Sequence, residues 1–333
     1  MKIISLCRTA STIARYYLFK KRTPLTISFL STYSCNQKCK YCDWTKLDMR
    51  SMSTEQSIGM IKELKKNGVI KLGFAGGESL NRDDISVLLE CSHKSGLITS
   101  ISSNGKAIMK HIDTLEKYVD VVQLSIDGSQ EIHDSLRGKG SYGIVINAIE
   151  MLKARKIKVI TNTVLTKRNL NDLGHILDIA SKYGHKALFQ PIFHYGISEN
   201  ENLIETLKPS HYEMNYAIEF LLCKKRRSKT VGNSTAFLRY IQKTWGKQSV
   251  MRCHANNLFC TIDPLGYVLP CCFDIRRNDD FNTIKHGFKQ AFTNSGKNGF
   301  PNNCFGCYCN AYIESNLAFS LHLSACINAL NIV

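Results

Sequence analysis

Acidic side chains are absent from the first 42 residues of this 333-residue chain. In that acid-free start, the stretch from Ile3 to Phe19 carries Arg8 and Arg15. We therefore expect a basic amphipathic helix within residues 1–23. The sequence leaves three uses for it open: docking on the rest of the protein, lying on an anionic membrane surface, or targeting.

Formal charge is also absent from Ser315 to Val333. Polar residues interrupt this stretch at Asn316, Ser320, His322, Ser324, Asn328 and Asn331. A helix that crosses a bilayer needs about 20 mostly apolar residues in succession, so these interruptions exclude a spanning helix. The sequence predicts a packed terminal helix instead.

Cysteine is too scarce for a secreted scaffold held together by disulfides, because it makes up 14 of the 333 residues. No signal peptide with a small-residue cleavage site precedes the first cysteine motif, so we expect a cytoplasmic protein. In a reducing cytosol, grouped cysteines indicate metal or cluster ligands. A hydrophobic content of 44% and a charged content of 21% exclude wholesale disorder.

Six β-rich runs alternate with helical segments between residues 25 and 193. The runs are LTISFL, VIKLGFAG, LITSISS, VDVVQLSI, IKVITNTVL and KALFQPIF. The first intervening helix is expected to open on a capping box of Ser53 and Gln56 and to stop at Gly68. Such βα alternation predicts an α/β fold with a parallel sheet, and six units make a partial (β/α)6 TIM-like barrel, here over residues 24–195.

The remaining chain divides into two parts. Residues 196–250 form a predicted connecting region that is helical from Pro209 to Cys223. Residues 251–333 include seven of the fourteen cysteines between Cys253 and Cys309. This density predicts a small C-terminal cysteine-rich domain that ends in a helix.

The strongest motif is Cys35, Cys39 and Cys42, a C-x3-C-x2-C spacing directly after the first predicted strand. Three thiolates from one loop can hold three irons of a 4Fe-4S cluster. The fourth iron is then open for a substrate. Structural zinc is the alternative, but zinc normally takes four protein ligands and this loop contains no histidine.

Polar and glycine residues follow at the ends of the next strands, on the face where barrel enzymes place their chemistry. They are Gly76, Gly77 and Glu78 after the second strand, Asn104 after the third, and Ser125 and Asp127 on the fourth. Glycines let the backbone approach a ligand closely, and a carboxylate accepts charge-assisted hydrogen bonds from an ammonium group.

This combination resembles the radical S-adenosylmethionine (SAM) superfamily. The resemblance implies that Cys35, Cys39 and Cys42 bind a 4Fe-4S cluster and that Tyr41 lies near the adenine. It implies that Gly76, Gly77 and Glu78 hold the methionine amino group, and that Asn104, Ser125 and Asp127 lie around the methionine carboxylate and the ribose. Ser79 stands where the family usually has proline.

The string HDSLRGKGSYGIVINAI, which begins at His133, resembles a segment of the SPASM/twitch subfamily of these enzymes. That subfamily carries a C-terminal cysteine-rich extension. Arg137 within the string has two interpretations of equal weight: it reaches the cofactor, or it caps a helix through Asp134.

Four later cysteines resemble the shortened, twitch version of the extension. They are Cys253, Cys271 and the C-x2-C pair Cys304 and Cys307, and the resemblance implies that they bind one auxiliary 4Fe-4S cluster. The sequence leaves open whether Cys260, Cys272 or Cys309 ligates this cluster, and a zinc ribbon is the alternative for this part. The segment FCTIDPLGYVLPC predicts two short strands joined by a turn at residues 263–266.

The resemblance implies an oxidoreductase that cleaves SAM reductively to a 5′-deoxyadenosyl radical and takes hydrogen from a substrate. An auxiliary cluster favours net oxidation, either of a peptide during maturation or of a small molecule. A low-potential electron donor such as flavodoxin or ferredoxin is also implied. The sequence does not identify the residues that act on the substrate.

A net charge of +17 would attract anionic partners, including an acidic peptide or an anionic membrane surface. The competing hypothesis is therefore a non-catalytic iron-sulfur or zinc protein that binds nucleic acid. No basic strand interleaved with aromatic residues supports base stacking. A binding module also has no use for a methionine site at Glu78 and Asp127, so nucleic acid is the less favoured partner.

Overall fold

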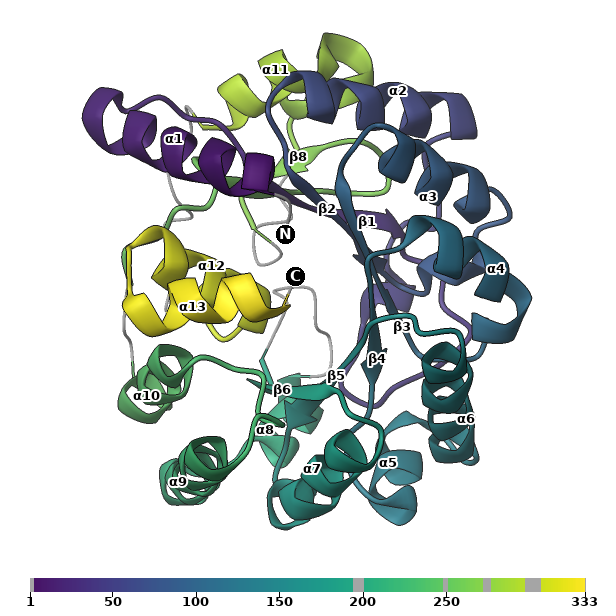
Figure 1. Cartoon of the computed structure of the whole chain (residues 1–333). Coiled ribbons are helices and arrows are strands. Elements are labelled where there is room, and N and C mark those ends of the chain that lie inside the picture. The colour runs from purple at the N-terminus through teal and green to yellow at the C-terminus, as the bar shows by residue number, and fades with distance from the viewer. Residues whose placement is uncertain (1–2, 194–200, 248–250, 272–276, 297–306, 333) are drawn as a thin grey trace.

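The computed structural model describes residues 3–193, 201–247, 251–271, 277–296 and 307–332. An eight-stranded sheet curves through the molecule, with helices on its outer side (Figure 1). The strands are β1 (Thr26–Thr32), β2 (Lys71–Gly76), β3 (Ile98–Ser103), β4 (Val121–Ser125), β5 (Val159–Leu165), β6 (Lys186–Pro191), β7 (Phe259–Ile262) and β8 (Val268–Leu269).

Thirteen helices accompany these strands in the described part of the chain. They are α1 (Ile3–Phe19), α2 (Thr54–Lys66), α3 (Ile85–Lys94), α4 (Ile108–Tyr118), α5 (Gln130–Arg137), α6 (Ser141–Ala154), α7 (Leu173–Lys182), α8 (Glu201–Leu207), α9 (His211–Arg227), α10 (Thr235–Thr244), α11 (Thr283–Ser295), α12 (Asn310–Phe319) and α13 (Leu323–Ile332). In Figure 1, α12 and α13 lie on the side that the curved sheet leaves open.

The strand order is β6-β5-β4-β3-β2-β1-β7-β8. The six strands β1 to β6 pair in parallel in chain order, so the predicted partial barrel of six units is confirmed. β7 pairs in parallel with β1, with Thr26 opposite Phe259, and β8 returns antiparallel to β7. The cysteine-rich part therefore begins with a hairpin that extends the barrel sheet.

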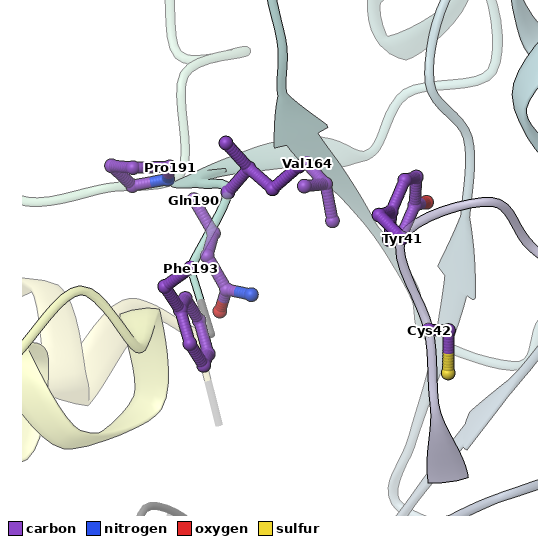
Figure 2. A pocket seen from close by; sticks show the side chains of 7 residues that line it. Tyr41, Cys42, Val164, Gln190, Pro191 and Phe193 are labelled. Carbon is purple, nitrogen blue, oxygen red and sulfur yellow. The ribbon is translucent and has the colours of Figure 1, made fainter. Parts of the chain in front are cut away.

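The free edge of β6 is covered by the side chain of Asn233. Its Oδ1 accepts from Phe189 N at 2.7 Å, and its Nδ2 donates to Phe189 O at 3.0 Å and to Asn310 Oδ1 at 3.1 Å. Asn310 N in turn donates to Gln190 Oε1 at 3.0 Å. These bonds join α12 to the carboxyl end of β6, where a cavity of about 50 Å³ opens (Figure 2).

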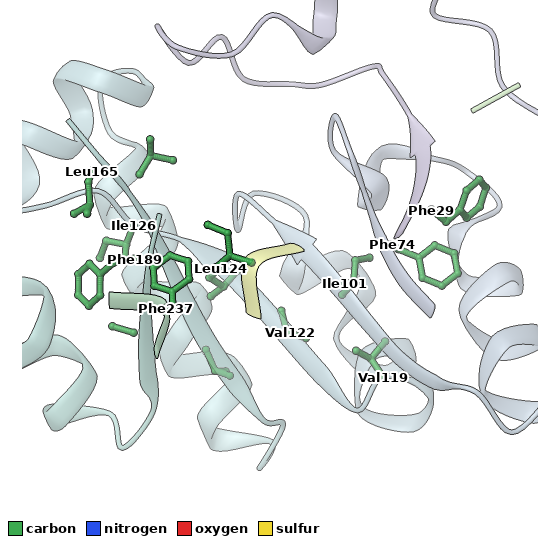
Figure 3. Close-up of a cluster of buried hydrophobic side chains, with 14 of the residues drawn as sticks. Phe29, Phe74, Ile101, Val119, Val122, Leu124, Ile126, Leu165, Phe189 and Phe237 are labelled. Atoms are coloured by element: carbon green, nitrogen blue, oxygen red, sulfur yellow. The ribbon is translucent and has the colours of Figure 1, made fainter. Parts of the chain in front are cut away.

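Alternation along the strands separates the barrel core from its concave interior. Phe29 and Phe74 are buried, and their rings lie 5.7 Å apart between centroids (Figure 3). Ile101 and Leu124 continue this core on the next two strands. Since successive side chains point to opposite faces, the intervening residues point into the barrel. Several of them are small or polar, such as Gln123, which donates to Ser102 Oγ at 3.3 Å.

The predicted capping box at the start of α2 is confirmed. Gln56 N donates to Ser53 Oγ at 3.2 Å, and Ser53 N donates to Gln56 Oε1 at 2.9 Å. Helix α2 ends at Lys66, just before Gly68, whose φ of +90° suits glycine. Met60, Ile61 and Leu64 of α2 are buried in the main core.

Helix α1 docks on the C-terminal part of the chain. Tyr17 Oη donates to Phe319 O of α12 at 2.8 Å, and the rings of Tyr16 and His254 meet edge to face. Of the three uses left open by the sequence, docking on the rest of the protein accounts for one side of this helix. No helix within the described residues has the length and apolar character needed to cross a membrane.

Candidate active site

The three cysteines of the first motif lie in the loop that leaves the carboxyl end of β1. Helix α5 holds this loop in place: Lys40 N donates to Leu136 O at 2.9 Å, and Gln37 Nε2 donates to Arg137 O at 2.8 Å. The spacer residues of the motif therefore fasten the loop to the end of α5.

Burial raises the pKa of all three thiols, and it raises that of Cys42 to about 12. Two donors face their sulfurs: Asn104 Nδ2 lies 3.9 Å from Cys35 Sγ, and Arg137 Nη1 lies 3.9 Å from Cys39 Sγ. In the described part of the chain, no three His, Cys, Asp or Glu side chains are placed to share a single metal ion. A 4Fe-4S cluster has a different requirement, because each of its cysteines binds a separate iron.

Gly76 and Gly77 allow β2 to end tightly against the cysteine loop. A Cβ on Gly76 would lie 2.3 Å from Thr32 O, and a Cβ on Gly77 would lie 2.2 Å from Ser34 O. Gly77 N also donates to Thr32 O at 2.7 Å. The two glycines therefore have a packing role in addition to the close ligand approach that the sequence predicts.

Glu78 is buried at the same edge and bridges two strand ends. Its Oε2 accepts from Asn104 N at 2.8 Å, and its Oε1 accepts from Leu80 N at 3.2 Å. Burial raises the pKa of Glu78 to about 7, although these hydrogen bonds oppose the shift. A cation brought to this carboxyl would favour its charged form.

Asp127 lies beyond the end of β4, and its carboxylate accepts three hydrogen bonds from protein groups. Oδ2 accepts from Tyr41 Oη and from Arg137 Nε, the latter at 2.5 Å, and Oδ1 accepts from Val164 N at 2.9 Å. The Arg137 guanidinium also lies 5.5 Å from the centre of the Tyr41 ring. Asp127 is fully buried, so it orients Tyr41 and Arg137 beside the cysteine loop.

The structure decides between the two interpretations of Arg137 as far as Asp134 is concerned. Asp134 accepts from Gly140 N at 2.7 Å and from Tyr142 N at 2.8 Å, at the start of α6. It therefore caps that helix by itself, and Arg137 pairs with Asp127 instead. The interpretation in which Arg137 caps a helix through Asp134 is wrong, because backbone N–H groups at the start of α6 already bind the Asp134 carboxylate.

Sequence reasoning missed two further residues that hold Asp127. Asp127 N donates to His133 Nδ1 at 3.1 Å, and Asn169 Nδ2 donates to Asp127 O at 2.9 Å. Burial lowers the pKa of His133 to about 4, which keeps its ring neutral and able to accept. His133 opens the recognised HDSLRG string, whereas nothing in the sequence marks Asn169.

Ser125 is half-buried at the carboxyl end of β4, opposite Asn162 of β5. The Oδ1 atom of Asn162 is buried and accepts no hydrogen bond from the described residues. Figure 2 shows the nearby opening, where Tyr41 and Cys42 lie across from Gln190 and Phe193. The barrel mouth thus combines apolar walls with acceptors that a bound molecule can use.

The second cysteine set also comes together in part. Burial raises the pKa of Cys307 well above its usual range, and the neighbouring Cys309, Cys271 and Cys253 contribute. Asn316 Nδ2 of α12 lies 3.6 Å from Cys253 Sγ, a contact that the sequence did not predict. Cys260 instead lies buried within β7, and Cys304 and Cys272 lie outside the described residues.

The barrel part of the chain matches a known protein family. Residues 29–180 match the model of the radical SAM superfamily. These residues form a radical SAM domain. Domains of this family work with a 4Fe-4S cluster and SAM, and the matched range includes all three cysteines of the first motif.

Two curated relatives extend the comparison in sequence. The chain is 29% identical over 259 residues to mycofactocin maturase MftC of Mycolicibacterium smegmatis, which covers 76% of this chain and 65% of that protein. It is 24% identical over 273 residues to the AdoMet-dependent heme synthase of Methanosarcina barkeri, covering 74% and 76%. The chain thus spans a little under two thirds of that MftC.

Solved structures share the fold of this chain. Streptococcus suis SuiB bound to S-adenosylmethionine superposes with a TM-score of 0.68 at 16% identity, covering 96% of this chain and 80% of SuiB. Native anSMEcpe with bound AdoMet and Cp18Cys peptide gives 0.65 at 18% identity, covering 92% and 99%.

Proposed function

We propose that this chain is a radical SAM oxidoreductase that modifies a precursor peptide, with net oxidation of the peptide. One observation carries the proposal: the cysteine loop lies between Asn104 on one side and the buried Arg137–Asp127 pair on the other. Thiolates that share a cluster are negatively charged, and these two side chains direct N–H donors at Cys35 and Cys39. The donor set thus fits an anionic cluster.

Each residue of the first motif then has a task. Cys35, Cys39 and Cys42 would bind three irons, and their raised thiol pKa values mean that binding releases protons. Glu78 would hold the ammonium group of SAM, and its pKa near 7 suits a carboxyl that gains charge when that cation arrives. Tyr41, fastened to Asp127, would support the adenine.

The other strand-end residues would complete the SAM site. Gly76 and Gly77 bring the end of β2 against the cysteine loop, and Asn104 and Ser125 end the next two strands. When bound, SAM and its cluster would supply the power to abstract a hydrogen atom from the substrate. An auxiliary cluster would accept the substrate's second electron, and the proton would go to solvent. The apolar wall of Val164 and Phe193 would keep water from the reacting atoms.

For the auxiliary cluster we propose Cys253, Cys271, Cys304 and Cys307 as ligands. The closeness of Cys253, Cys271 and Cys307 supports this assignment. Cys309 is also near Cys307, so it is the alternative fourth ligand. Asn316 would donate to the Cys253 thiolate, as outer-shell donors do in other metal sites.

The comparisons favour a peptide over a small molecule as the substrate. The MftC relatives are named maturases, and SuiB has been solved with its precursor peptide SuiA. The reducing electron would come from a low-potential donor of the flavodoxin or ferredoxin type. The net charge of +17 favours acidic partners for both roles.

The decisive experiment is the formation of 5′-deoxyadenosine by the anaerobically reconstituted protein with SAM and dithionite. We expect product from the wild type and none from Cys39→Ala. A matched control is Cys91→Ala on α3, outside both cysteine sets, which should retain wild-type activity. Formation of 5′-deoxyadenosine by Cys39→Ala would contradict the proposed site.

A further inference from the structure

A surface remote from the cysteine loop exposes an apolar stripe on α13. Leu323, Ile327 and Leu330 recur at i, i+4 and i+7, so they share one side of this helix. Leu323 is 75% exposed, and the other two are about half exposed. The opposite side of α13 packs inward through Ala325 and Asn328. The helix therefore turns its larger apolar side chains toward solvent.

The end of α1 extends this stripe. Leu18 is 73% exposed and Phe19 is 74% exposed. The bond from Tyr17 Oη to Phe319 O places them beside the α12–α13 turn, where Leu321 is also exposed. Figure 1 shows α1 and α13 on the same, near side of the molecule. We call the surface formed by α1, the α12–α13 turn and α13 the basal face.

The basal face lies by the amino ends of the barrel strands. Leu25 and Ile70 directly precede β1 and β2, and they belong to the same buried cluster as Phe319, against which Tyr16 packs. The cysteine loop follows the carboxyl end of β1. The basal face and the barrel mouth are therefore at opposite ends of the strands.

Cations accompany the exposed apolar side chains, and the segments that form the basal face contain no carboxylate. Residues 1–42 and 315–333 contain no Asp or Glu. Arg8, Arg15, Lys20 and Lys21 are exposed, and Arg252 lies 4.9 Å above the Tyr17 ring. Glu314 precedes the acid-free stretch and is largely buried against Ser234 N.

We propose that the basal face docks the protein on a bilayer that contains anionic phospholipid. Side chains such as Phe19 and Leu323 would enter the interface, and Arg15, Lys20 and Lys21 would meet the phosphate groups. A second copy fits poorly, because two such faces would bring like charges together. Nucleic acid fits poorly too, because it would leave the leucines in water. Docking this way leaves the barrel mouth facing away from the bilayer.

The test uses the full chain and sedimentation with two kinds of vesicle. One contains phosphatidylcholine alone, and the other also contains about 30% phosphatidylserine, whose negative surface potential attracts basic segments. We expect at least about 100-fold tighter binding to the anionic vesicles, because each cation contributes about fivefold. Binding should weaken as salt rises. Hydrogen exchange of the wild type should slow in α1 and α13 when anionic vesicles are added. This second readout needs no variant.

Two variants with matched controls distinguish binding through the basal face from attraction by the overall positive charge of the protein. Arg15→Gln with Lys20→Gln and Lys21→Gln should weaken anionic binding about 100-fold, at about fivefold per cation. The control changes three exposed cations near the strand carboxyl ends, Lys110, Lys139 and Lys167, to Gln. Phe19→Ser with Leu323→Ser should weaken binding by at least about tenfold. The matched control is Met109→Ser with Tyr212→Ser, because these two side chains have similar exposed fractions.

Three outcomes would overturn the proposal. The first is equal binding to neutral and anionic vesicles. The second is an equal loss in the control variants, which would assign binding to net charge alone. The third is a wild-type dimer in light scattering that Phe19→Ser with Leu323→Ser converts to a monomer, which would make the basal face an interface between copies.

Discussion

Arg137 donates from Nε to Asp127 Oδ2 at 2.5 Å, while Nη1 of the same guanidinium lies 3.9 Å from Cys39 Sγ. Burial lowers the pKa of Arg137, but Asp127, Tyr41 and Cys39 together outweigh burial and raise the pKa well above its usual range. The guanidinium therefore stays charged between a carboxylate and a cysteine sulfur. This pair links the end of β4 to the loop after β1.

Removing one member of this buried pair should be costly, because the other charge is left without a partner. We expect Arg137→Gln and Asp127→Asn each to lower the free energy of unfolding by about 3 to 5 kcal/mol. The double variant should lose clearly less than the sum of the two. Urea denaturation of all three variants measures this.

The control for that cycle is an exposed pair of similar length. Arg155 Nη1 lies 2.5 Å from Glu116 Oε2 at the surface. Arg155→Gln should leave the free energy of unfolding nearly unchanged, because solvent screens exposed pairs. Strict additivity in the Arg137 and Asp127 cycle would mean that the two residues do not act as a pair.

Glu78 should make the stability of the free protein depend on pH. Burial raises its pKa to about 7, above the ordinary value of 4.5 expected in the unfolded chain. The folded state then binds more protons between these values, so stability falls as pH rises from about 4.5 to 7. The loss is about 3 kcal/mol. Glu78→Gln should remove it, which unfolding measurements at pH 5 and pH 8 will reveal.

The same residue predicts the pH dependence of SAM binding. The affinity of the reconstituted wild type should rise as pH passes through about 7, because the charged carboxylate then holds the ammonium without paying for ionisation. Glu78→Gln should bind SAM about 10- to 100-fold more weakly at pH 8. The exposed Glu116→Gln serves as the control. An unchanged affinity in Glu78→Gln would make the strand-end motif an ordinary turn.

Two clusters should give about eight irons per chain after anaerobic reconstitution. Changing Cys35, Cys39 and Cys42 to Ala should leave about four, since the second set lies on other segments. Cys223→Ala on α9 should retain the wild-type iron content. Stoichiometric zinc without iron-sulfur absorbance would refute both cluster assignments.

Most of the barrel could be predicted because its signals are local. The six β-rich runs, the capping box at Ser53 and the turn after β7 each depend on neighbouring residues, and each occurs in the structure. The pairing of β7 with β1 is different, because about 230 residues separate Thr26 from Phe259. No sequence pattern says which sheet edge such a hairpin joins. The sequence analysis also did not predict α10. Its residues lie within residues 196–250, which were predicted to be a connecting region.

The site likewise has some residues that local sequence signals predict and others that only the fold reveals. Glu78 and Asn104 could be selected from the sequence, since each lies within two residues of the end of a strand. A hydrogen bond joins them. The role of Arg137 could not be decided, because Asp134 and Asp127 are both within reach of a residue at the end of α5. Only the fold shows that backbone N–H groups occupy Asp134.

The last prediction separates electron transfer from a structural role for the second cysteine set. Glu78, Asn104 and Arg137 form their bonds within the barrel, so SAM cleavage should not need the second set. Cys304→Ala with Cys307→Ala should therefore still form 5′-deoxyadenosine with dithionite. Given a precursor peptide that the wild type oxidises, the same variant should fail to form the product lighter by two hydrogens, because the second electron has no acceptor. Mass spectrometry of peptide and nucleoside from one reaction measures both. If a folded double variant oxidises the peptide at the wild-type rate, the second set only holds the hairpin of β7 and β8 against α12.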